Sequence, residues 1–442
     1  MHLLNHHLIS LILFGSLFRG CIAYADIKTS LIAENLNFIS TDYDANPKSF
    51  SFVGLQIKSD RKPTDFFKMD VTAEYAPSNS VLSFVNAKEI FYNFSVGESS
   101  NLYVGRRLQN WSNIDQLWNF GVIQPQFTWN RLNPQSQGLT GIFWDQKMAS
   151  FSYTVFASPI FIPDQGASFE IKDGQFQSGN PFFRAPPQNV KFQGQLLPID
   201  YNINRPEIDK IISQTMGGLQ LRYGDEKGFY ARAAGIYKPS NQLALGYTGV
   251  LVTTRVRVDV TPKSYYETDY SVDTGYRDDW GYVQLSALST NPKNPEFDSS
   301  FNAPQFSSGT MWGPQILFNF NPFQLLLAYV NTSGGEVIDV GPDVSSDRAS
   351  LSERFLFKQA ALAKIGYSDL YLNSFRWDSS YQFKYSPKEK FREIRFKNTL
   401  NFRGPWKVWA DLILIDTDSS VLSGYEVYKN QDQIWLGVSY DL

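Results

Sequence analysis

The chain has 442 residues, a formal net charge of −3, 16% aromatic residues and 19% charged residues. Soluble enzymes typically carry about 25% charged residues, so this chain is rich in aromatics and poor in charge. Its mean hydropathy is −0.29. Because no apolar run after the N-terminus approaches the roughly 18 residues of a membrane helix, the sequence excludes a multi-helix membrane protein.

Residues 1–25 have the features of a secretory signal peptide. An apolar stretch covers residues 8–18, and Ala-Tyr-Ala at 23–25 supplies a small-x-small cleavage pattern. We therefore expect the mature chain to be 26–442. The alternative, a lipoprotein modified at Cys21, is disfavoured because a phenylalanine and an arginine precede that cysteine closely.

All the histidines and the only cysteine lie in this predicted signal peptide: His2, His6, His7 and Cys21. The mature chain then cannot form a Ser-His-Asp triad, a cysteine nucleophile, a histidine-bound zinc site, an iron–sulfur cluster or a disulfide. Adjacent Asp278 and Asp279 could in principle serve a hydrolase, but neighbouring strand residues point to opposite faces. We therefore predict no enzyme, no cofactor and no metal site.

The dominant pattern is a period-2 alternation in segments of about ten residues. In 392–403 the apolar residues are Ile394, Phe396, Leu400 and Phe402, and charged or polar residues stand between them. Segments 66–75, 251–260 and 374–385 alternate in the same way. A soluble sandwich would pack the apolar face inward, whereas an outer-membrane barrel turns it to lipid. Phe, Trp and Tyr on the apolar faces and both signs of charge on the polar faces favour the barrel.

The alternating segments indicate an all-β protein, a transmembrane antiparallel β-barrel that forms one domain. Counting candidate segments gives about 16 to 20 strands, and bacterial single-chain barrels use even numbers. We predict 16 strands, with 18 as the alternative. The stretch 345–365 is ambiguous because it also has the pattern of an amphipathic helix. The other segments are 29–39, 49–59, 87–96, 101–107, 138–147, 149–158, 215–223, 228–237, 263–273, 279–288, 310–320, 323–332, 354–366, 405–415 and 432–442.

Two long insertions, 108–137 and 159–212, interrupt the regular spacing. Seven of the 22 prolines lie in 159–212, and proline is excluded from central strands. Because this segment is also apolar, and long loops are usually functional, we predict that 159–212 folds into the lumen. A loop outside the barrel is the alternative. The charges expected to narrow the pore are Asp164, Glu170, Asp173, Arg184 and Lys191. The tryptophans of 108–137 indicate loop packing rather than a solute-binding slide.

The polar faces of the predicted strands supply the candidate pore lining. Charges of opposite sign could orient solutes by a transverse field, but most are expected to be cross-strand ion pairs that stabilise the wall. The pair Arg255/Arg257 with Arg395/Lys397 is the candidate selective patch. The full set is Arg107, Arg222, Arg232, Arg255, Arg257, Arg376, Arg395, Lys397, Asp70, Glu74, Asp259, Asp378 and Glu393, with Glu89 and Asp411 as further carboxylates.

The chain end resembles the assembly signal of outer-membrane barrels: an apolar last residue, an aromatic two before it and a glycine five before the end. These are Leu442, Tyr440 and Gly437, although such proteins most often end in Phe. With the signal peptide and the strand pattern, the chain resembles Gram-negative outer-membrane porins. It also has features similar to the porin-like barrels of predatory bacteria, which form rings that can enclose lipid.

The resemblance implies a bacterial outer-membrane porin that lets small hydrophilic solutes or ions diffuse through a loop-constricted lumen. Its partners would be outer-membrane lipid, the barrel-assembly machinery and copies of itself, as a trimer or larger ring, and not nucleic acid. The alternative is a plugged, oligomeric structural barrel that organises outer-membrane lipid.

Overall fold

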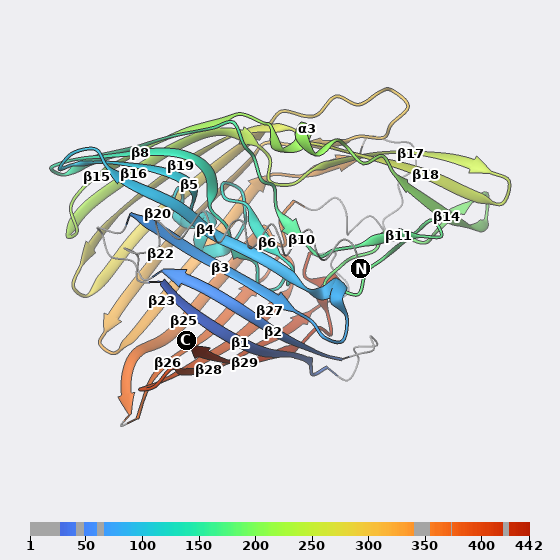
Figure 1. The fold of residues 1–442 in the computed structure, drawn as a ribbon. Helices are drawn as coiled ribbons and strands as arrows, with labels where there is room; N and C mark the ends of the chain where they lie inside the picture. Colours follow the sequence, from blue (N-terminus) through green and yellow to red (C-terminus); the bar gives the residue numbers. More distant parts are fainter. Residues whose placement is uncertain (1–26, 41–47, 60–65, 340–353, 373, 419–423) are drawn as a thin grey trace, which may run out of the picture.

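The computed structural model describes residues 27–40, 48–59, 66–339, 354–372, 374–418 and 424–442 (Figure 1). The predicted signal peptide falls outside the described residues, as does the first part of the ambiguous stretch 345–365. From Gln359 on, that stretch is strand rather than helix. No helix in the described part of the chain is long and apolar enough to cross a membrane.

In the residues that the structure describes, eighteen antiparallel strands close into one barrel. The prediction of 16 strands is therefore wrong and the alternative of 18 is confirmed. The barrel strands are β1 (Ile27–Phe38), β2 (Ser49–Ser59), β3 (Phe67–Tyr75), β4 (Phe84–Ser95), β5 (Ser100–Arg107), β8 (Leu139–Met148), β9 (Phe151–Ser158), β15 (Met216–Tyr223), β16 (Gly228–Pro239), β19 (Tyr266–Asp278), β20 (Gly281–Pro292), β22 (Gly309–Phe320), β23 (Phe323–Gly334), β25 (Gln359–Leu372), β26 (Phe375–Ser386), β27 (Phe391–Phe402), β28 (Trp406–Thr417) and β29 (Gln433–Asp441).

The first and last strands complete the ring. β29 pairs antiparallel with β1 from Ser30↔Asp441 to Phe38↔Gln433, and the backbone N–H of Leu442 donates to the carbonyl of Thr29 at 2.8 Å. Closure of this kind removes the unpaired edges that an open sheet would expose.

The connections differ sharply between the two ends of the barrel. At one end the turns are short, such as 149–150, 224–227 and 279–280. At the other end the strands are joined by long segments such as 108–138 and 159–215. Short periplasmic turns and longer extracellular loops are the arrangement of outer-membrane barrels.

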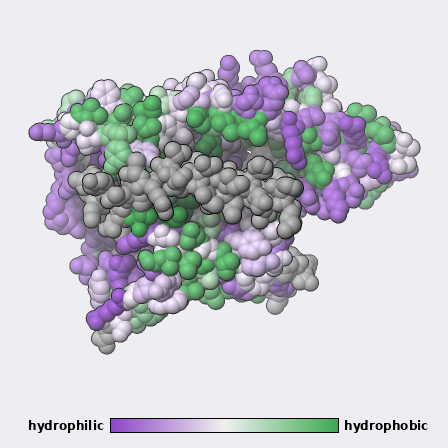
Figure 2. Space-filling view, in the orientation of Figure 1, coloured by the Kyte–Doolittle hydropathy of each residue, from purple (hydrophilic) through white to green (hydrophobic). Residues whose placement is uncertain are grey.

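The outward faces of the strands are apolar at mid-height and aromatic towards both ends. Exposed aliphatic side chains at mid-height include Val272, Leu285 and Leu327, and Figure 2 shows such apolar patches on the visible wall. The short-turn end carries Phe229, Phe320, Phe323, Tyr371 and Trp406, and the long-loop end carries Tyr75, Tyr237, Trp312 and Tyr385. An apolar band between two aromatic girdles is typical of a barrel in a bilayer.

A second sheet projects beyond the long-loop end of the barrel. It joins β13 (Asn189–Phe192), β14 (Gln195–Ile203), β18 (Arg255–Lys263) and β17 (Ala244–Val252) in that order. Figure 1 shows this sheet, here called the arm, extending past the other loops. The segment 251–260, predicted as a barrel strand, therefore belongs to the arm instead. Alternation alone cannot separate the two, because a sheet exposed on one face alternates as well.

Short elements complete the loops. They are α2 (Asn113–Trp118), α3 (Ile208–Ile212), η2 (Ser80–Leu82), η3 (Glu426–Tyr428), β6 (Gln126–Thr128), β7 (Gln135–Ser136), β10 (Gln165–Gly166), β11 (Glu170–Lys172), β12 (Gln175–Gln177), β21 (Pro304–Phe306) and β24 (Val337–Asp339). Strands β10, β6 and β7 form a small sheet of their own.

Segment 108–137 lies inside the barrel. The backbone N–H of Asn113 donates to Asp273 on β19 at 3.3 Å, whereas Asn130 donates to Gln433 on β29 at 3.1 Å. Arg395 on β27 donates to Asn133 at 2.8 Å. Since β19 is far around the ring from β27 and β29, the segment crosses the interior from one wall to the other.

The apolar side chains of this segment pack with inward side chains of the barrel strands in the core of the molecule. Trp111, Ile114, Phe127 and Trp129 are almost fully buried, which agrees with the predicted loop packing. The helix α2 begins after Ser112, which caps it, and the Asp115 carboxylate accepts the backbone N–H groups of Val122 and Ile123 at 3.0 Å each.

The insertion 159–212 does not enter the interior as a unit. Phe161 and Phe182 are buried, and the Phe182 ring lies 6.0 Å from the ring of Trp129. By contrast, β13 of the arm is exposed along its whole length. The segment that crosses the barrel is thus 108–137, and 159–212 contributes only parts that pack against it.

Candidate functional site

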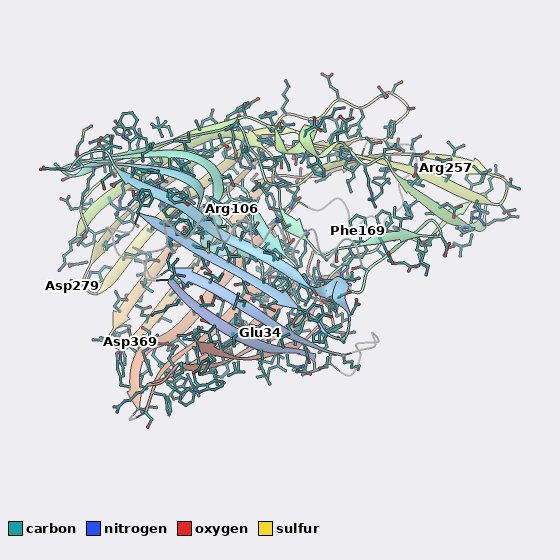
Figure 3. The ribbon with its side chains drawn as sticks, viewed as in Figure 1. Glu34, Arg106, Phe169, Arg257, Asp279 and Asp369 are labelled. Atoms are coloured by element: carbon teal, nitrogen blue, oxygen red, sulfur yellow. The ribbon has the colours of Figure 1, made fainter. Side chains whose placement is uncertain are left out.

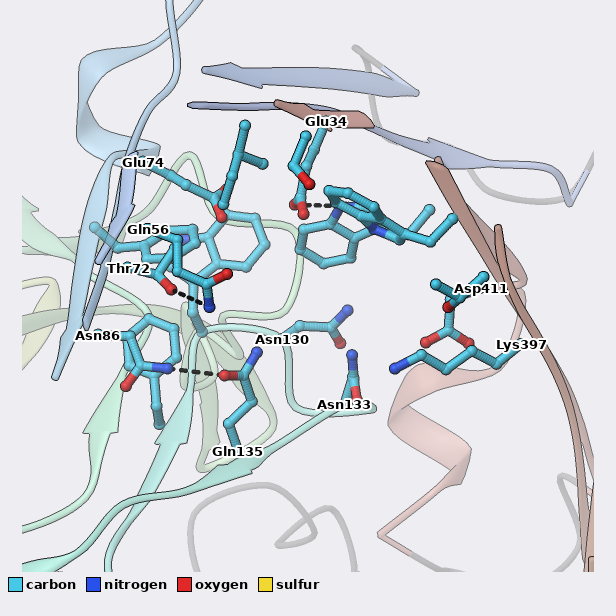
Figure 4. Close-up of a pocket in the computed structure, with 18 of the residues that line it drawn as sticks. Glu34, Gln56, Thr72, Glu74, Asn86, Asn130, Asn133, Gln135, Lys397 and Asp411 are labelled. Atoms are coloured by element: carbon cyan, nitrogen blue, oxygen red, sulfur yellow. Dashed lines mark hydrogen bonds between the residues drawn. The ribbon is translucent and has the colours of Figure 1, made fainter. Parts of the chain in front are cut away.

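Segment 108–137 is called the inner segment from here on. A cavity of about 300 Å³ lies between its residues 126–135 and the barrel wall (Figure 4). The wall is formed by inward side chains of β1 to β4 and of β27 to β29. Volumes near 300 Å³ lie at the lower end of those that hold small-molecule ligands. The lining residues are Ile32, Glu34, Gln56, Thr72, Glu74, Phe84, Asn86, Phe127, Trp129, Asn130, Asn133, Gln135, Lys397, Thr399, Lys407, Trp409, Asp411, Trp435 and Ser439.

One side of the cavity carries two carboxylates, Glu34 on β1 and Glu74 on β3. Glu34 accepts a hydrogen bond from the Trp435 indole N–H at 2.6 Å. Glu74 is 7% exposed, and its Oε2 has no hydrogen-bond partner. Figure 4 shows both side chains pointing into the cavity.

Strand β2, between those two strands, makes room for this arrangement at Gly54. Gly54 is the register partner of Glu74, and a Cβ at residue 54 would lie 2.7 Å from Glu74 Cγ. The glycine therefore lets the Glu74 side chain lie across β2 towards β1.

The opposite side of the cavity is basic. Lys397 on β27 and Lys407 on β28 both line it. Lys397 lies within electrostatic range of the Asp411 carboxylate, its register partner on β28, and of the cations Arg395, Lys364 and Lys88. Figure 4 shows Lys397 across the cavity from Glu74, so negative and positive groups face each other over the enclosed space.

Aromatic rings stand beside the carboxylates. The rings of Trp129 and Trp435 are 6.1 Å apart, and the Phe84 ring lies 5.5 Å from Trp129 and 5.1 Å from Phe127. The Trp129 indole N–H donates to the carbonyl of Leu82 at 3.0 Å, which fixes the ring. The site thus combines charged groups with rigid aromatic faces.

Side-chain amides form the floor of the cavity and are held by one another. Asn86 on β4 donates to Gln135 at 2.8 Å and accepts from Gln137 at 2.8 Å. The inner segment is thereby tied to the wall at this point.

Several of the predicted pore-lining charges form ion pairs in the barrel. Arg107 contacts Asp145 through two hydrogen bonds, of 3.1 and 2.6 Å. The other pairs are Arg232 with Asp273 at 2.7 Å, Arg376 with Asp369 at 3.2 Å and Asp378 at 3.4 Å, Lys384 with Glu393 at 3.0 Å, Lys68 with Glu89 at 2.6 Å, and Arg395 with Asp411.

The remaining wall residues are less enclosed. Asp70 accepts from Gln56 at 3.4 Å, and Arg222 is exposed near the short-turn end of β15. Of the charges predicted to line the pore, Glu74 and Lys397 are the two that line the cavity; the added carboxylate Asp411 does so as well.

Three predicted pore residues, Arg255, Arg257 and Asp259, lie on β18 of the arm, outside the barrel. There Arg255 pairs with Asp200 at 2.8 Å and Arg257 with Asp259 at 3.2 Å. Figure 3 shows Arg257 on the arm, far from Glu34 on the barrel wall. The predicted patch of these arginines with Arg395 and Lys397 is therefore wrong.

The five predicted constriction charges are dispersed. Glu170 and Asp173 are exposed at the β11–β12 hairpin, and Lys191 is exposed on β13. The Arg184 guanidinium lies over the Tyr428 ring at 4.3 Å. Asp164 reaches the inner segment, where it accepts the backbone N–H of Gln126 at 2.7 Å.

Burial raises the pKa of the Asp164 carboxyl to about 7. The Gln126 N–H and the positive charges of Arg131 and Lys238 act in the opposite direction, and the charge of Asp115 adds to the increase. This carboxyl therefore titrates near neutral pH at the junction of two loops.

The residues of the predicted assembly signal close the barrel. Gly437 faces the Trp409 indole, whose nearest atoms would be 2.2 Å from a Cβ at residue 437. Tyr440 packs against Trp406 with ring centroids 4.9 Å apart. Leu442 is 71% exposed at the short-turn end.

Sequence reasoning missed Glu34 and Lys407 at this site. The alternation of β1 is obscured because Ile32, Leu36 and Phe38 point inward. No group of three or more metal-binding side chains occurs in the described ranges.

No protein-family model and no curated protein matches this sequence. Among solved structures, the chain is similar to OccAB1 of Acinetobacter baumannii, with 10% identity, 96% of this chain and 97% of that chain covered, and a TM-score of 0.48. It is similar to OpdL of Pseudomonas aeruginosa, with 9% identity, coverage of 95% and 99%, and a TM-score of 0.47. For a BenF-like porin from Pseudomonas fluorescens the values are 9%, 96% and 100%, and 0.46.

Proposed function

We propose that this protein is a porin of the bacterial outer membrane, through which small polar solutes diffuse. The observation that carries the proposal is a closed barrel with an apolar outer band between two aromatic girdles. Such a surface is stable in hydrocarbon, because every backbone group of a closed barrel is paired. The difference in length between the connections at the two ends supports the same assignment.

The inner segment 108–137 constricts the lumen in this proposal. It is tied to opposite walls by Asn113 and Asn130, so it narrows the barrel rather than closing it as a detachable lid. Solutes pass along the cavity beside residues 126–135, where the transverse field between Glu74 and Lys397 orients them.

Single-channel conductance in planar bilayers tests the porin assignment. The purified protein should give discrete, ohmic openings in KCl, and vesicles containing it should swell in small sugars. A protein that inserts into the bilayer and remains silent would contradict the proposal and favour a plugged structural barrel.

A pair of tryptophan substitutions tests the route. Thr72 lines the cavity, and Ala73, its neighbour on β3, points to the outside because successive strand residues alternate between faces. Thr72→Trp should lower the conductance substantially by filling the cavity, whereas Ala73→Trp should insert normally and conduct like the unmodified protein. Equal conductance of both variants would place the route elsewhere in the barrel.

A further inference from the structure

The two carboxylates on the acidic side of the cavity differ from the other carboxylates of the inner wall in their partners. Nearly all other inward carboxylates have a cationic partner on a neighbouring strand, as Asp273 has Arg232 and Glu393 has Lys384. Neither Glu34 nor Glu74 takes part in a salt bridge in the described part of the chain. Two carboxylates on the same side of a cavity therefore face it without a protein cation between them.

The Glu74 carboxylate has a hydrogen-bond acceptor that lacks a donor. Its Oε2 is buried, has no hydrogen-bond partner and points into the cavity (Figure 4). A buried acceptor without a partner is destabilising, and more so when it is charged. The absence of a side chain at Gly54 leaves the space that Glu74 occupies, so the wall itself accommodates the acceptor in this position.

The aromatic rings of the cavity limit which kinds of ligand could supply the missing donor. The Trp435 indole N–H is already donated to Glu34 at 2.6 Å. What Trp435, Trp129 and Phe84 present to the cavity is therefore the part of each ring that lines it, which can make apolar or cationic contacts. A cation near such a ring is stabilised by its quadrupole. A hard metal ion is a poor occupant, because Ca²⁺ takes six to eight oxygen ligands and the ring faces supply none.

We propose that Glu34 and Glu74, together with the rings of Trp129, Trp435 and Phe84, bind the ammonium or guanidinium group of a small solute. The N–H donors of such a group satisfy both carboxylates, and its charge lies against the rings. Lys397 and Lys407 on the opposite side repel the cationic end, so the solute is held in one orientation. The proposal deepens the proposed function, because it names the class of solute that the channel recognises.

Binding is measured first on the detergent-solubilised protein by titration calorimetry, with butylguanidinium chloride as the probe. Butyramide and sodium butyrate are neutral and anionic controls of similar length. Butylguanidinium should bind and the two controls should bind at least about tenfold more weakly, because they cannot make the charge-assisted hydrogen bonds to the carboxylates. This measurement does not depend on channel activity, so its failure and that of the porin assignment are distinguishable.

Three variants locate the binding site. Glu34→Gln and Glu74→Gln keep the size of the side chains and should each weaken butylguanidinium binding about tenfold or more. Glu226→Gln removes the same charge at an exposed turn outside the cavity and should bind like the unmodified protein. In bilayers, butylguanidinium should reduce the current of the unmodified protein and of Glu226→Gln at concentrations that leave Glu74→Gln unaffected.

Two results would overturn the proposal. The first is equal affinity for butylguanidinium in the unmodified protein and in the Glu34→Gln, Glu74→Gln double variant, provided the variant remains a folded barrel by circular dichroism. The second is binding of butyramide as tight as that of butylguanidinium, since the site would then recognise the shape of the solute and not its charge.

Discussion

Gly437 and Trp409 meet on neighbouring strands, and the indole of Trp409 occupies the space that a side chain at residue 437 would need. The two residues are register partners on β29 and β28, and a Cβ at 437 would lie 2.2 Å from the indole. The glycine of the predicted assembly signal therefore has a packing role in the finished barrel. It keeps a tryptophan flat against the wall of the cavity.

Gly437→Ala should destabilise the barrel by about 1–3 kcal/mol, the usual range for overpacking, and Gly437→Val by more. Thermal unfolding followed by circular dichroism measures the difference. Gly404→Ala is the control, because nothing lies within 4 Å of a Cβ added there. If Gly437→Ala and Gly404→Ala unfold alike, Trp409 can move at little cost and the packing argument fails.

Lys238→Met should be strongly destabilising. Lys238 is fully buried and lies 2.9 Å from Glu267 and 3.8 Å from Asp269. Arg354 also contacts Glu267. Removing the lysine leaves two buried carboxylates with one cation, and breaking a buried pair in this way costs about 3–5 kcal/mol.

The matched control for this cluster is Lys227→Met. Lys227 pairs with Asp279 at 2.5 Å, but both side chains are largely exposed, and exposed pairs contribute about 0–1 kcal/mol. Denaturant unfolding of the two variants should therefore separate clearly. Similar unfolding midpoints would mean that water reaches the Lys238 cluster.

Most of the barrel could be predicted because period-2 alternation follows directly from strand geometry and the contrast between lipid and lumen. Except for 251–260, the predicted segments became barrel strands, so the count of 16 was too low. Segment 251–260 alternates as well as any barrel strand, and only its pairing with β14 and β17 distinguishes it.

The cavity was harder to predict because it depends on contacts between distant segments. Glu74 and Lys397 were found from alternation, but Glu34 was not, since the inward Ile32 and Leu36 pack in the interior and hide the polar face of β1. Counting apolar residues pointed to 159–212 as the lumenal loop. The deciding contacts, such as Asn130 with Gln433, have no local signal.

The junction held by Asp164 should become less stable as the pH rises. Because burial raises the pKa of Asp164 in the folded protein to about 7 from the usual 3.8, the folded protein binds more protons than the unfolded chain between these values. Stability from this group is therefore greatest below about pH 4 and is lost progressively as the pH rises to about 7.

Asp164→Asn tests this sign. The asparagine keeps an oxygen that can accept the Gln126 N–H but cannot ionise, so the variant should lose less stability than the unmodified protein when the pH is raised from 5 to 8. Thermal unfolding at several pH values measures it. Parallel pH profiles for the two proteins would show that Asp164 is ionised throughout this range.

Substitutions at Lys397 should shift the ion selectivity of the channel towards cations. Lys397 lines the cavity opposite Glu74, and its positive charge raises the local concentration of anions. In a KCl gradient, Lys397→Gln should move the reversal potential in the cation-selective direction, and Lys397→Glu roughly twice as far because it changes two charges.

Lys210→Gln is the control, since Lys210 is exposed on α3 and pairs with Glu207 at 3.1 Å. The shift should shrink at high salt, where charges are screened over about 3 Å at 1 M. If Lys210→Gln shifts the reversal potential and Lys397→Gln does not, the selective region lies in the loops outside the barrel and not at the cavity.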